Sequence, residues 1–303
     1  MTPEQILADI KTDRRKRVIL DCDTANEMDD QYAVAYVLGR SDRFELLAMT
    51  AEHHASRGNP RSIGMEESYD EFFRVMKVCH KEGACPVYRG APSSMCEDAL
   101  CRPVTSEASR AIVRLARESD DILYILATGP VTNIAAAISE APDITEKLCV
   151  VWLGGNCYEW ESASECNVWG DCPAAQIMMD SGAMVIQLPA FGKEDHGTVQ
   201  LRITRDDFME NLAGDGDASV FFRDTLPTEH KRCTEWEAHV IWDIAGPCVL
   251  TLPEAYEFSI VPAPIFTDNI EYRFDDTRHR IIYMERLAPK IILDDMYKVI
   301  NSL

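Results

Sequence analysis

The sequence predicts an α/β fold with an open, mostly parallel sheet that is flanked by helices. Two observations predict it. Short apolar runs alternate along the chain with longer stretches in which apolar and small residues recur at helical spacing. The runs are nearly continuous in apolar character, which is typical of strands that are buried on both faces of a parallel sheet. Helices normally supply the right-handed connections between such strands.

The expected elements follow in order. Strands are expected at 17–21, 45–50, 122–127, 148–153, 184–189, 258–262 and 280–285. Helices are expected at 31–38, 65–78, 107–115, 133–138 and 293–303. Segment 192–251 is polar, so we expect helices and loops there rather than sheet. The simplest organisation is a single domain, 1–303, in which this segment is an insertion that borders the ligand pocket.

Composition and charge exclude several classes of protein. The chain has 303 residues with 30 basic and 51 acidic side chains, which gives a formal net charge of −21. Such a surface repels phosphate backbones and anionic lipid, so nucleic acid and membranes are not expected as partners. We find no apolar run that could span a bilayer and no apolar signal core at the N-terminus, so a cytoplasmic location is expected.

The cysteines indicate a reducing compartment. The 11 cysteines are odd in number and include no Cys-x-x-Cys pair. We therefore expect buried free thiols rather than disulfides. The paired spacing of a zinc site is absent from the sequence.

The most informative segment lies where the first expected strand ends. Asp21, Asp23, Glu27, Asp29 and Asp30 fall within ten residues, immediately before an apolar helix. Ligands of open α/β sheets bind at the carboxyl ends of the strands. Crowded carboxylates repel each other there by about 4 kcal/mol per pair at 4 Å and an effective dielectric constant near 20. A hard divalent cation would relieve this repulsion. Helix capping explains two of these acids and hardly all of them.

Several segments together resemble the inosine–uridine-type nucleoside hydrolase family. Asp21-Cys-Asp23 followed by Asp29-Asp30 resembles its N-terminal signature. Segments 127–134 and 150–155 resemble its central Thr-Gly…Thr-Asn segment and its next strand with a glycine pair. Glu165-Cys-Asn167 resembles its Glu-x-Asn substrate segment, and Asp243 stands where the family has its C-terminal metal aspartate. The resemblance is closest to the purine-preferring branch of the family.

The resemblance implies a Ca²⁺ cofactor and roles for individual residues. Asp23, Asp30 and Asp243 would be carboxylate ligands, and Thr128 would offer its main-chain carbonyl. Asp23 would be the general base toward a metal-bound water in N-glycosidic hydrolysis through an oxocarbenium-like state. Ribose hydroxyls would be held by Asp29, Glu165 and Asn167. The family also implies a homodimer or homotetramer.

Three departures from the family pattern matter. The acidic loop is two residues longer than usual, so Asn26 or Glu27 could point into the site. The asparagine expected after the second strand has no clean match, and Glu52, His53 and Asn59 are the candidates. Trp242 replaces the histidine that often precedes the metal aspartate, and stacking of a base on its ring predicts a preference for purines. His239 and His230 remain candidates for a leaving-group acid.

Plainer alternatives stay open. Thr128 and Asn133 could only shape a turn and cap its helix, and Glu165 and Asn167 could be ordinary polar loop residues. Trp160 and Trp169 are expected to pack rather than to stack on a ligand. The alternative functions are hydrolysis of another N-ribosyl compound and binding of nucleosides with weak catalysis. A phosphohydrolase with an Asp-x-Asp-x-Thr motif fits Asp21 and Asp23 only superficially, because the downstream segments do not belong to that class.

Overall fold

The computed structural model describes residues 1–55, 58–229 and 238–303. Within them, the main sheet has eight strands in the order β3-β2-β1-β4-β5-β6-β12-β9. Neighbouring strands run parallel, except that the edge strand β9 pairs antiparallel with β12. The strands of this sheet are β1 (Lys16–Cys22), β2 (Phe44–Ala51), β3 (Val87–Tyr88), β4 (Leu123–Ala127), β5 (Leu148–Leu153), β6 (Met184–Leu188), β9 (Tyr256–Pro262) and β12 (Arg280–Leu287).

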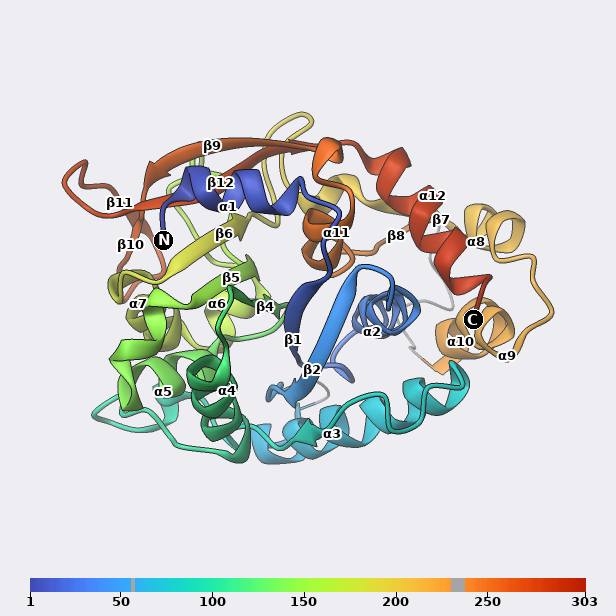
Figure 1. Ribbon diagram of the computed structural model, residues 1–303, viewed down its shortest axis with the longest axis horizontal. Coiled ribbons are helices and arrows are strands. Elements are labelled where there is room, and N and C mark those ends of the chain that lie inside the picture. Colours follow the sequence, from blue (N-terminus) through green and yellow to red (C-terminus); the bar gives the residue numbers. More distant parts are fainter. Residues whose placement is uncertain (56–57, 230–237) are drawn as a thin grey trace.

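Helices cover both faces of the sheet (Figure 1). One face packs against α1 (Pro3–Ile10), α2 (Asp29–Gly39), α3 (Arg61–Val78), α11 (Ala245–Thr251) and α12 (Pro289–Ile300). The other face packs against α4 (Glu107–Glu118), α5 (Thr132–Glu140) and α7 (Cys172–Asp180). The short helix α6 (Cys166–Gly170) directly precedes α7.

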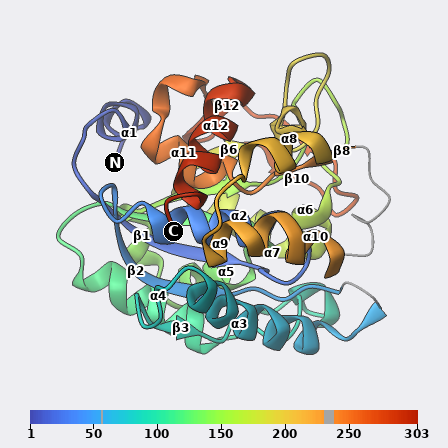
Figure 2. The same cartoon turned by 90° about the vertical axis from the view of Figure 1, so that its right-hand side faces the viewer.

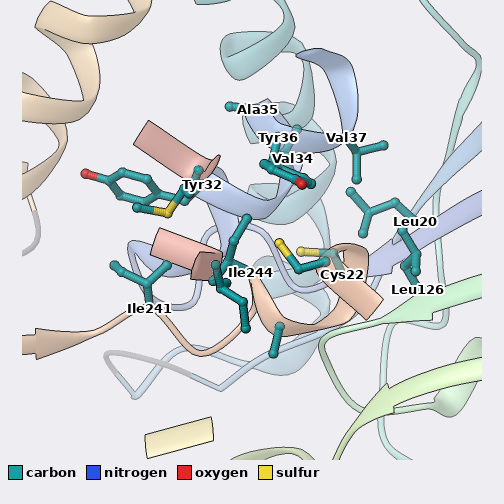
Figure 3. Packing of buried hydrophobic residues seen from close by; sticks show 14 of the residues in the cluster. Leu20, Cys22, Tyr32, Val34, Ala35, Tyr36, Val37, Leu126, Ile241 and Ile244 are labelled. Atoms are coloured by element: carbon teal, nitrogen blue, oxygen red, sulfur yellow. The ribbon is translucent and has the colours of Figure 1, made fainter. Parts of the chain in front are cut away.

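The central strands are apolar on both sides because each side faces a helical layer. In β1, Val18 and Leu20 belong to the core on the α2 side, whereas Ile19 between them belongs to the core on the α5 side. Figure 3 shows Leu20 and Cys22 of β1 and Leu126 of β4 near Tyr36 and other side chains of α2. This packing fixes the register of β1 and so determines where its acidic end emerges.

The described part of the segment 192–251 contains helices, as expected, and also a short pair of strands, which was not expected. Its described residues form α8 (Arg205–Asn211), α9 (Asp217–Val220), a π-helical turn η5 (Phe221–Thr225) and α10 (Leu226–Glu229). They also form a short antiparallel pair of strands, β7 (Arg202–Thr204) and β8 (Ala238–Val240). The helices α8, α9 and α10 lie together at one end of the molecule (Figures 1 and 2).

The predicted α/β fold is confirmed, and the expected strands and helices are present with ends that differ by a few residues. The sequence reading did not anticipate α1, β3, α6, α7 or the two-stranded pair β10 (Ile265–Phe266) and β11 (Tyr272–Arg273). It also did not anticipate the 3₁₀ turns η2 (Met95–Glu97), η3 (Pro142–Glu146), η4 (Thr198–Gln200) and η6 (Pro253–Ala255). In the part of the chain that the structure describes, every helix is too short or too polar to traverse a bilayer.

Candidate functional site

A pocket of about 220 Å³ lies at the carboxyl ends of the central strands. The segments that follow β1, β4, β5 and β6 all reach it, as does the segment before α11. Its lining consists of Asp23, Asn26, Glu27, Asp29, Asp30, Thr128, Leu153, Glu165, Cys166, Asn167, Ala190, Phe191, Trp242 and Asp243. Parallel strands end at one edge of a sheet, so residues that are far apart in the sequence meet here.

The loop between β1 and α2 is folded around its own carboxylates. Asn26 donates a backbone hydrogen bond to the Asp23 carbonyl (2.8 Å) and a side-chain hydrogen bond to Asp23 Oδ2 (2.9 Å). The backbone N–H of Glu27 donates to Asp30 Oδ2 (3.1 Å). These bonds hold the two extra residues of the loop in a compact turn, and they bring Asn26 and Glu27 into the pocket lining.

Four aspartates converge at the base of the pocket. Asp23, Asp29 and Asp30 are each 3% exposed and Asp243 is 4% exposed. The backbone N–H of Asp243 donates to Asp29 Oδ2 (3.3 Å), which ties the loop before α11 to the first turn of α2. Ligand atoms of Asp30, Asp243 and Cys22 lie within 4.8 Å of one another. Buried carboxylates at this density are costly unless a proton or a cation neutralises them.

The pKa values of these groups report that cost. Burial raises the pKa of Asp23 to about 7; hydrogen bonds from its own backbone and from Asn26 oppose the rise, and the charge of Glu27 adds to it. Burial, reinforced by negatively charged neighbours, places the pKa values of Asp29, Asp30 and Asp243 well above the usual range. The buried carboxylates therefore bind protons, and a divalent cation would take the place of these protons.

Thr128 and Asn167 bring a main-chain carbonyl to the same site. Asn167 Nδ2 donates to the carbonyl oxygens of Thr128 (3.0 Å) and Leu153 (2.9 Å). A carbonyl oxygen has two lone pairs, so the Thr128 oxygen can accept this bond and still serve as a ligand. The amide oxygen of Asn167 remains to accept a hydrogen bond from a bound molecule.

Glu165 begins the helix α6 and is neither a free loop residue nor a free acid. Its carboxylate accepts hydrogen bonds from the backbone N–H groups of Gly155, Asn167 and Val168, each at 2.8 Å. Burial nevertheless raises its pKa to about 7, against these three bonds. Because Glu165 is the N-cap of α6 and binds the backbone N–H of Asn167, its carboxylate fixes the position of Asn167 in the pocket.

An aromatic wall, which we define as Trp160, Phe191 and Trp242, borders the pocket. The rings of Phe191 and Trp242 meet edge to face, with centroids 4.9 Å apart and an interplanar angle of 62°. Trp160 stacks on Phe191, with ring centroids 6.3 Å apart. Phe191 and Trp242 line the pocket, and Trp242 also packs against the hydrophobic core. Trp169 is 59% exposed and lies below the guanidinium of Arg61, so it belongs to the surface rather than to the core.

Behind the pocket, Asn133 joins the ends of β1 and β2 to α5. Its amide nitrogen donates to Asp21 Oδ1 and to the Ala51 carbonyl, each at 3.1 Å, and its backbone N–H donates to Glu52 Oε1 (2.8 Å). The alternative that Asn133 caps its helix is wrong, because α5 has Val131 as its N-cap and no side-chain cap. Asp21, which also lies behind the pocket, is fully buried within β1 and accepts a hydrogen bond from Thr50 Oγ1 (2.6 Å).

The pocket lining contains the residues that were expected to bind the metal, act as general base or contact the substrate. The set is Asp23, Asn26, Asp29, Asp30, Thr128, Glu165, Asn167, Trp242 and Asp243. The candidates after the second strand are placed differently, because Glu52, His53 and Asn59 are not among the residues that line the pocket. Burial lowers the pKa of His53 to about 3, so it stays neutral beside Thr132 (3.0 Å). His230 lies outside the described residues.

The sequence did not single out four of the lining residues, which are Leu153, Cys166, Ala190 and Phe191. Cys166 is the middle residue of the Glu-x-Asn segment, so its position was available from that pattern. Phe191 follows β6 at the same sheet edge, and the rule that ligands meet strand ends could have indicated it.

Free thiols were expected, and the described cysteines form no disulfides. The expectation that the thiols are buried does not hold for Cys96, Cys101 and Cys166, which are exposed.

The donor set fits a hard cation. Asp23, Asp30 and Asp243 offer buried carboxylate oxygens, and the Thr128 carbonyl lies in the same lining. Ca²⁺ takes carboxylate and carbonyl oxygens together with water. The raised pKa values of the aspartates indicate unneutralised negative charge, which such an ion would balance.

The fold and this pocket define an α/β protein whose ligand site, rich in carboxylates, is assembled at the carboxyl ends of a parallel sheet. Comparison with known proteins identifies the family within this class. Residues 18–270 match the sequence profile of the inosine-uridine preferring nucleoside hydrolases. The chain belongs to this family.

Individual relatives agree with the family and differ in their named specificity. The pyrimidine-specific ribonucleoside hydrolase RihA of Enterobacter sp. (strain 638) is 27% identical over an alignment of 192 positions, and the alignment covers 56% of this chain and 58% of the relative. The chain thus spans little more than half the length of such curated relatives.

Solved structures extend the likeness of the fold to nearly the whole chain. A plant nucleoside hydrolase, PpNRh1, has a TM-score of 0.75 at 18% identity and covers 95% of this chain and 99% of its own. A purine-preferring ribonucleoside hydrolase from Gardnerella vaginalis has a TM-score of 0.75 at 20% identity, with coverages of 95% and 98%.

Proposed function

We propose that this protein hydrolyses the N-glycosidic bond of ribonucleosides, with purines preferred, in a reaction that depends on a divalent cation. The observation that carries the proposal is the convergence of Asp23, Asp30 and Asp243 with the Thr128 carbonyl in one buried pocket. Family membership supports the class of reaction, and the donor set supports Ca²⁺ as the cofactor. When bound, the ion would acidify a water and orient the ribose hydroxyls.

In this mechanism, Asp23 accepts the proton of the attacking water. The raised pKa of Asp23, about 7, is suited to a group that takes up a proton near neutral pH. Asn26 donates to Oδ2 of the same carboxylate and so fixes its orientation. The remaining carboxylates of the pocket stabilise the positive charge that develops on the sugar in an oxocarbenium-like transition state.

The sugar is held by three side chains of the lining. Asp29 lies at the start of α2, and Asn167 and Glu165 lie at the start of α6, on the other side of the pocket. Each can accept a hydrogen bond from a ribose hydroxyl. Loss of one hydroxyl would leave a buried acceptor unpaired, so a deoxyribonucleoside is expected to react poorly.

The preference for purines follows from the aromatic wall. The named specificities of relatives differ, with pyrimidines for RihA and purines for the Gardnerella protein, so relatedness does not decide the base. Trp242 presents an aromatic ring to the pocket beside Phe191. Stacking of a base on such a ring is worth about 1–3 kcal/mol, and the larger purine offers more surface to it.

The test is release of ribose from inosine, guanosine, adenosine, uridine and cytidine, each with added Ca²⁺ and with a chelator. We expect ribose from the purine nucleosides, lost in the chelator and restored by Ca²⁺. If uridine is hydrolysed as fast as inosine, the proposed preference for purines is wrong, but the proposed hydrolase activity stands. Tight binding without ribose from any nucleoside would contradict hydrolysis and favour a binding protein.

A further inference from the structure

We propose that Cys157, Glu159 and His196 form a second metal site, which takes a divalent cation of the zinc class and lies behind the aromatic wall. One ligand atom from each of the three residues lies within 4.8 Å of the others. None of the three lines the pocket, so this site is distinct from the carboxylate cluster. The three residues are separated by up to 39 positions in the sequence, which is why the spacing of cysteines and histidines did not indicate it.

The donors differ from those of the pocket in chemical character. A thiol, an imidazole and a carboxylate are the three ligand types that Zn²⁺ prefers, whereas Ca²⁺ takes oxygen alone. Cys157 is fully buried, and His196 and Glu159 have side chains that are 27% and 28% exposed. An ion can therefore enter from solvent and reach the buried sulfur. Three protein ligands leave the fourth position of a tetrahedral ion to water.

The surroundings of His196 resemble those of a metal-bound imidazole. Its Nδ1 lies 2.8 Å from Glu159 Oε1, and its Nε2 lies 3.8 Å from Asp195 Oδ1. Arg286 holds the other oxygen of Asp195 at 3.1 Å. Histidines that bind metal through one nitrogen commonly donate from the other to a carboxylate. Asp195 faces this second nitrogen from beyond hydrogen-bond distance, so it adds negative charge beside the ring.

Glycine at position 192 leaves room for the three donors to approach. A Cβ atom at Gly192 would lie 2.5 Å from Cys157 Sγ and 2.6 Å from His196 Cβ. Both contacts are far below van der Waals distance, so a side chain here would push the sulfur and the histidine apart. The backbone N–H of Lys193 also donates to Glu159 Oε1 (3.2 Å), which fixes the carboxylate on the same side.

Binding would replace a direct contact between two side chains by coordination of both to the ion. The cation replaces the direct contact between His196 and Glu159, and the Cys157 thiol releases its proton to solvent as the metal–sulfur bond forms. No electrons are transferred, because Zn²⁺ is not redox-active. The ion would then join residues 157–159 to the segment that follows β6.

The site is coupled to the pocket through Phe191. The backbone N–H of Cys157 donates to the Phe191 carbonyl (2.7 Å), and Ala190 donates to the Gly155 carbonyl (2.8 Å). Phe191 and Ala190 both line the pocket. A metal that holds Cys157 to His196 would restrain the segment that carries Phe191, and so stiffen the wall against which a base would stack.

Binding of Co²⁺ to the full chain tests the proposal, with Ca²⁺ in excess to fill the carboxylate pocket. Thiolate coordination gives a sulfur-to-cobalt charge-transfer band in the near ultraviolet. We expect this band in the wild type, its loss in Cys157→Ala, and its displacement by Zn²⁺. The matched control is Cys149→Ala, which removes a buried thiol of β5 and should keep the band.

Cys22 provides the decisive comparison, because its sulfur lies beside Asp30 and Asp243. A band that survives in Cys157→Ala and disappears in Cys22→Ala would place the soft ion in the pocket and overturn the proposal. A wild type without any band would overturn it as well.

A second measurement keeps the proposal testable if Cys157→Ala does not fold. His196 lies near the surface, and we expect His196→Gln, which removes a ligand, to weaken Zn²⁺ affinity, measured against a chelating dye, by at least about tenfold. Unchanged affinity in His196→Gln would contradict the site. These readouts involve no nucleoside, so they succeed or fail independently of the proposed hydrolysis.

Discussion

The roles of single residues in this protein depend on burial more than on residue type. Asp13 is almost fully exposed at 99%, whereas Asp23 is 3% exposed among other acids and has a pKa near 7. An aspartate side chain is therefore a solvated charge at position 13 and can accept a proton near neutral pH at position 23. Predictions at this scale concern what one side chain contributes to the reaction or to binding.

Asp23→Asn should lower kcat for inosine by about 10²–10⁴-fold, because an amide cannot accept the proton of the attacking water. The measurement is the initial rate of ribose release at saturating inosine and Ca²⁺. Asp13→Asn is the control, since it removes an exposed acid and should change nothing. Full activity in Asp23→Asn would exclude this residue as the general base.

Trp242→Ala should raise KM for inosine more than KM for uridine. Loss of about 1–3 kcal/mol of stacking corresponds to roughly a fivefold to 150-fold change for the purine. Trp242→Phe keeps an aromatic face and should recover most of the preference, and Trp169→Ala removes an exposed ring outside the pocket as the control. Equal changes for both nucleosides would show that the ring is a packing residue.

At the scale of elements, one buried side chain, Asn133, joins the carboxyl ends of β1 and β2. Asn133→Ala would leave Asp21 Oδ1 and the Ala51 carbonyl without this donor, and it would also remove the acceptor of the Ala91 N–H (2.9 Å). We expect the free energy of unfolding to fall by at least about 2 kcal/mol. Urea denaturation measures it.

The control for Asn133→Ala is Thr145→Ala, which removes an exposed hydrogen bond to Pro142 and should shift the free energy of unfolding by less than about 0.5 kcal/mol. If Asn133→Ala also lowers the free energy of unfolding by less than about 0.5 kcal/mol, the hydrogen bonds of Asn133 do not stabilise the strands behind the pocket.

The elements also show what could be predicted from the sequence. Strands such as β5 were predictable because both of their faces are buried, which leaves a nearly continuous apolar run. The helix α7 was missed, because Cys172, Pro173 and a run of small and sulfur-containing residues give little contrast between its faces. The pair β7–β8 was missed because each strand has only three residues, too few for a periodic pattern.

For the site, the acidic cluster after β1 could be predicted from one short segment of the sequence. The residues that join it from distant segments could be predicted only from the resemblance to the family. Phe191 carries no motif, and only the fold brings it against Trp242. The metal-ligating group of Cys157, Glu159 and His196 was invisible, because two loops contribute it and neither has a known spacing. The role of 192–251 as an insertion stays a prediction, although Trp242 and Asp243 of this segment line the pocket.

At the scale of the whole molecule, the buried acids make stability depend on pH and on the cation. Folding raises the pKa of Asp23 from 3.8 to about 7 and that of Glu165 from 4.5 to about 7, in both cases through burial. The folded protein therefore binds these protons more tightly than the unfolded chain. Without a cation, the free energy of unfolding should fall as pH rises through the window between about 4 and 7.

Calcium should reverse this loss, because it replaces the protons that the carboxylates release. We predict that saturating Ca²⁺ raises Tm more at pH 8 than at pH 5, as measured by calorimetry with and without a chelator. Asp30→Asn should reduce the difference between the two pH values. A calcium effect that is equal at both pH values, or larger at pH 5, would indicate binding at exposed acids instead.

The central claim is that carboxylates from distant parts of the chain hold one hard cation. Calorimetric titration of the metal-free protein with Ca²⁺ tests it most directly. The account predicts one strong site per chain that is lost in both Asp30→Asn and Asp243→Asn, although these residues are 213 positions apart. Unchanged tight binding in either variant, or only weak binding at many sites in the wild type, would contradict it.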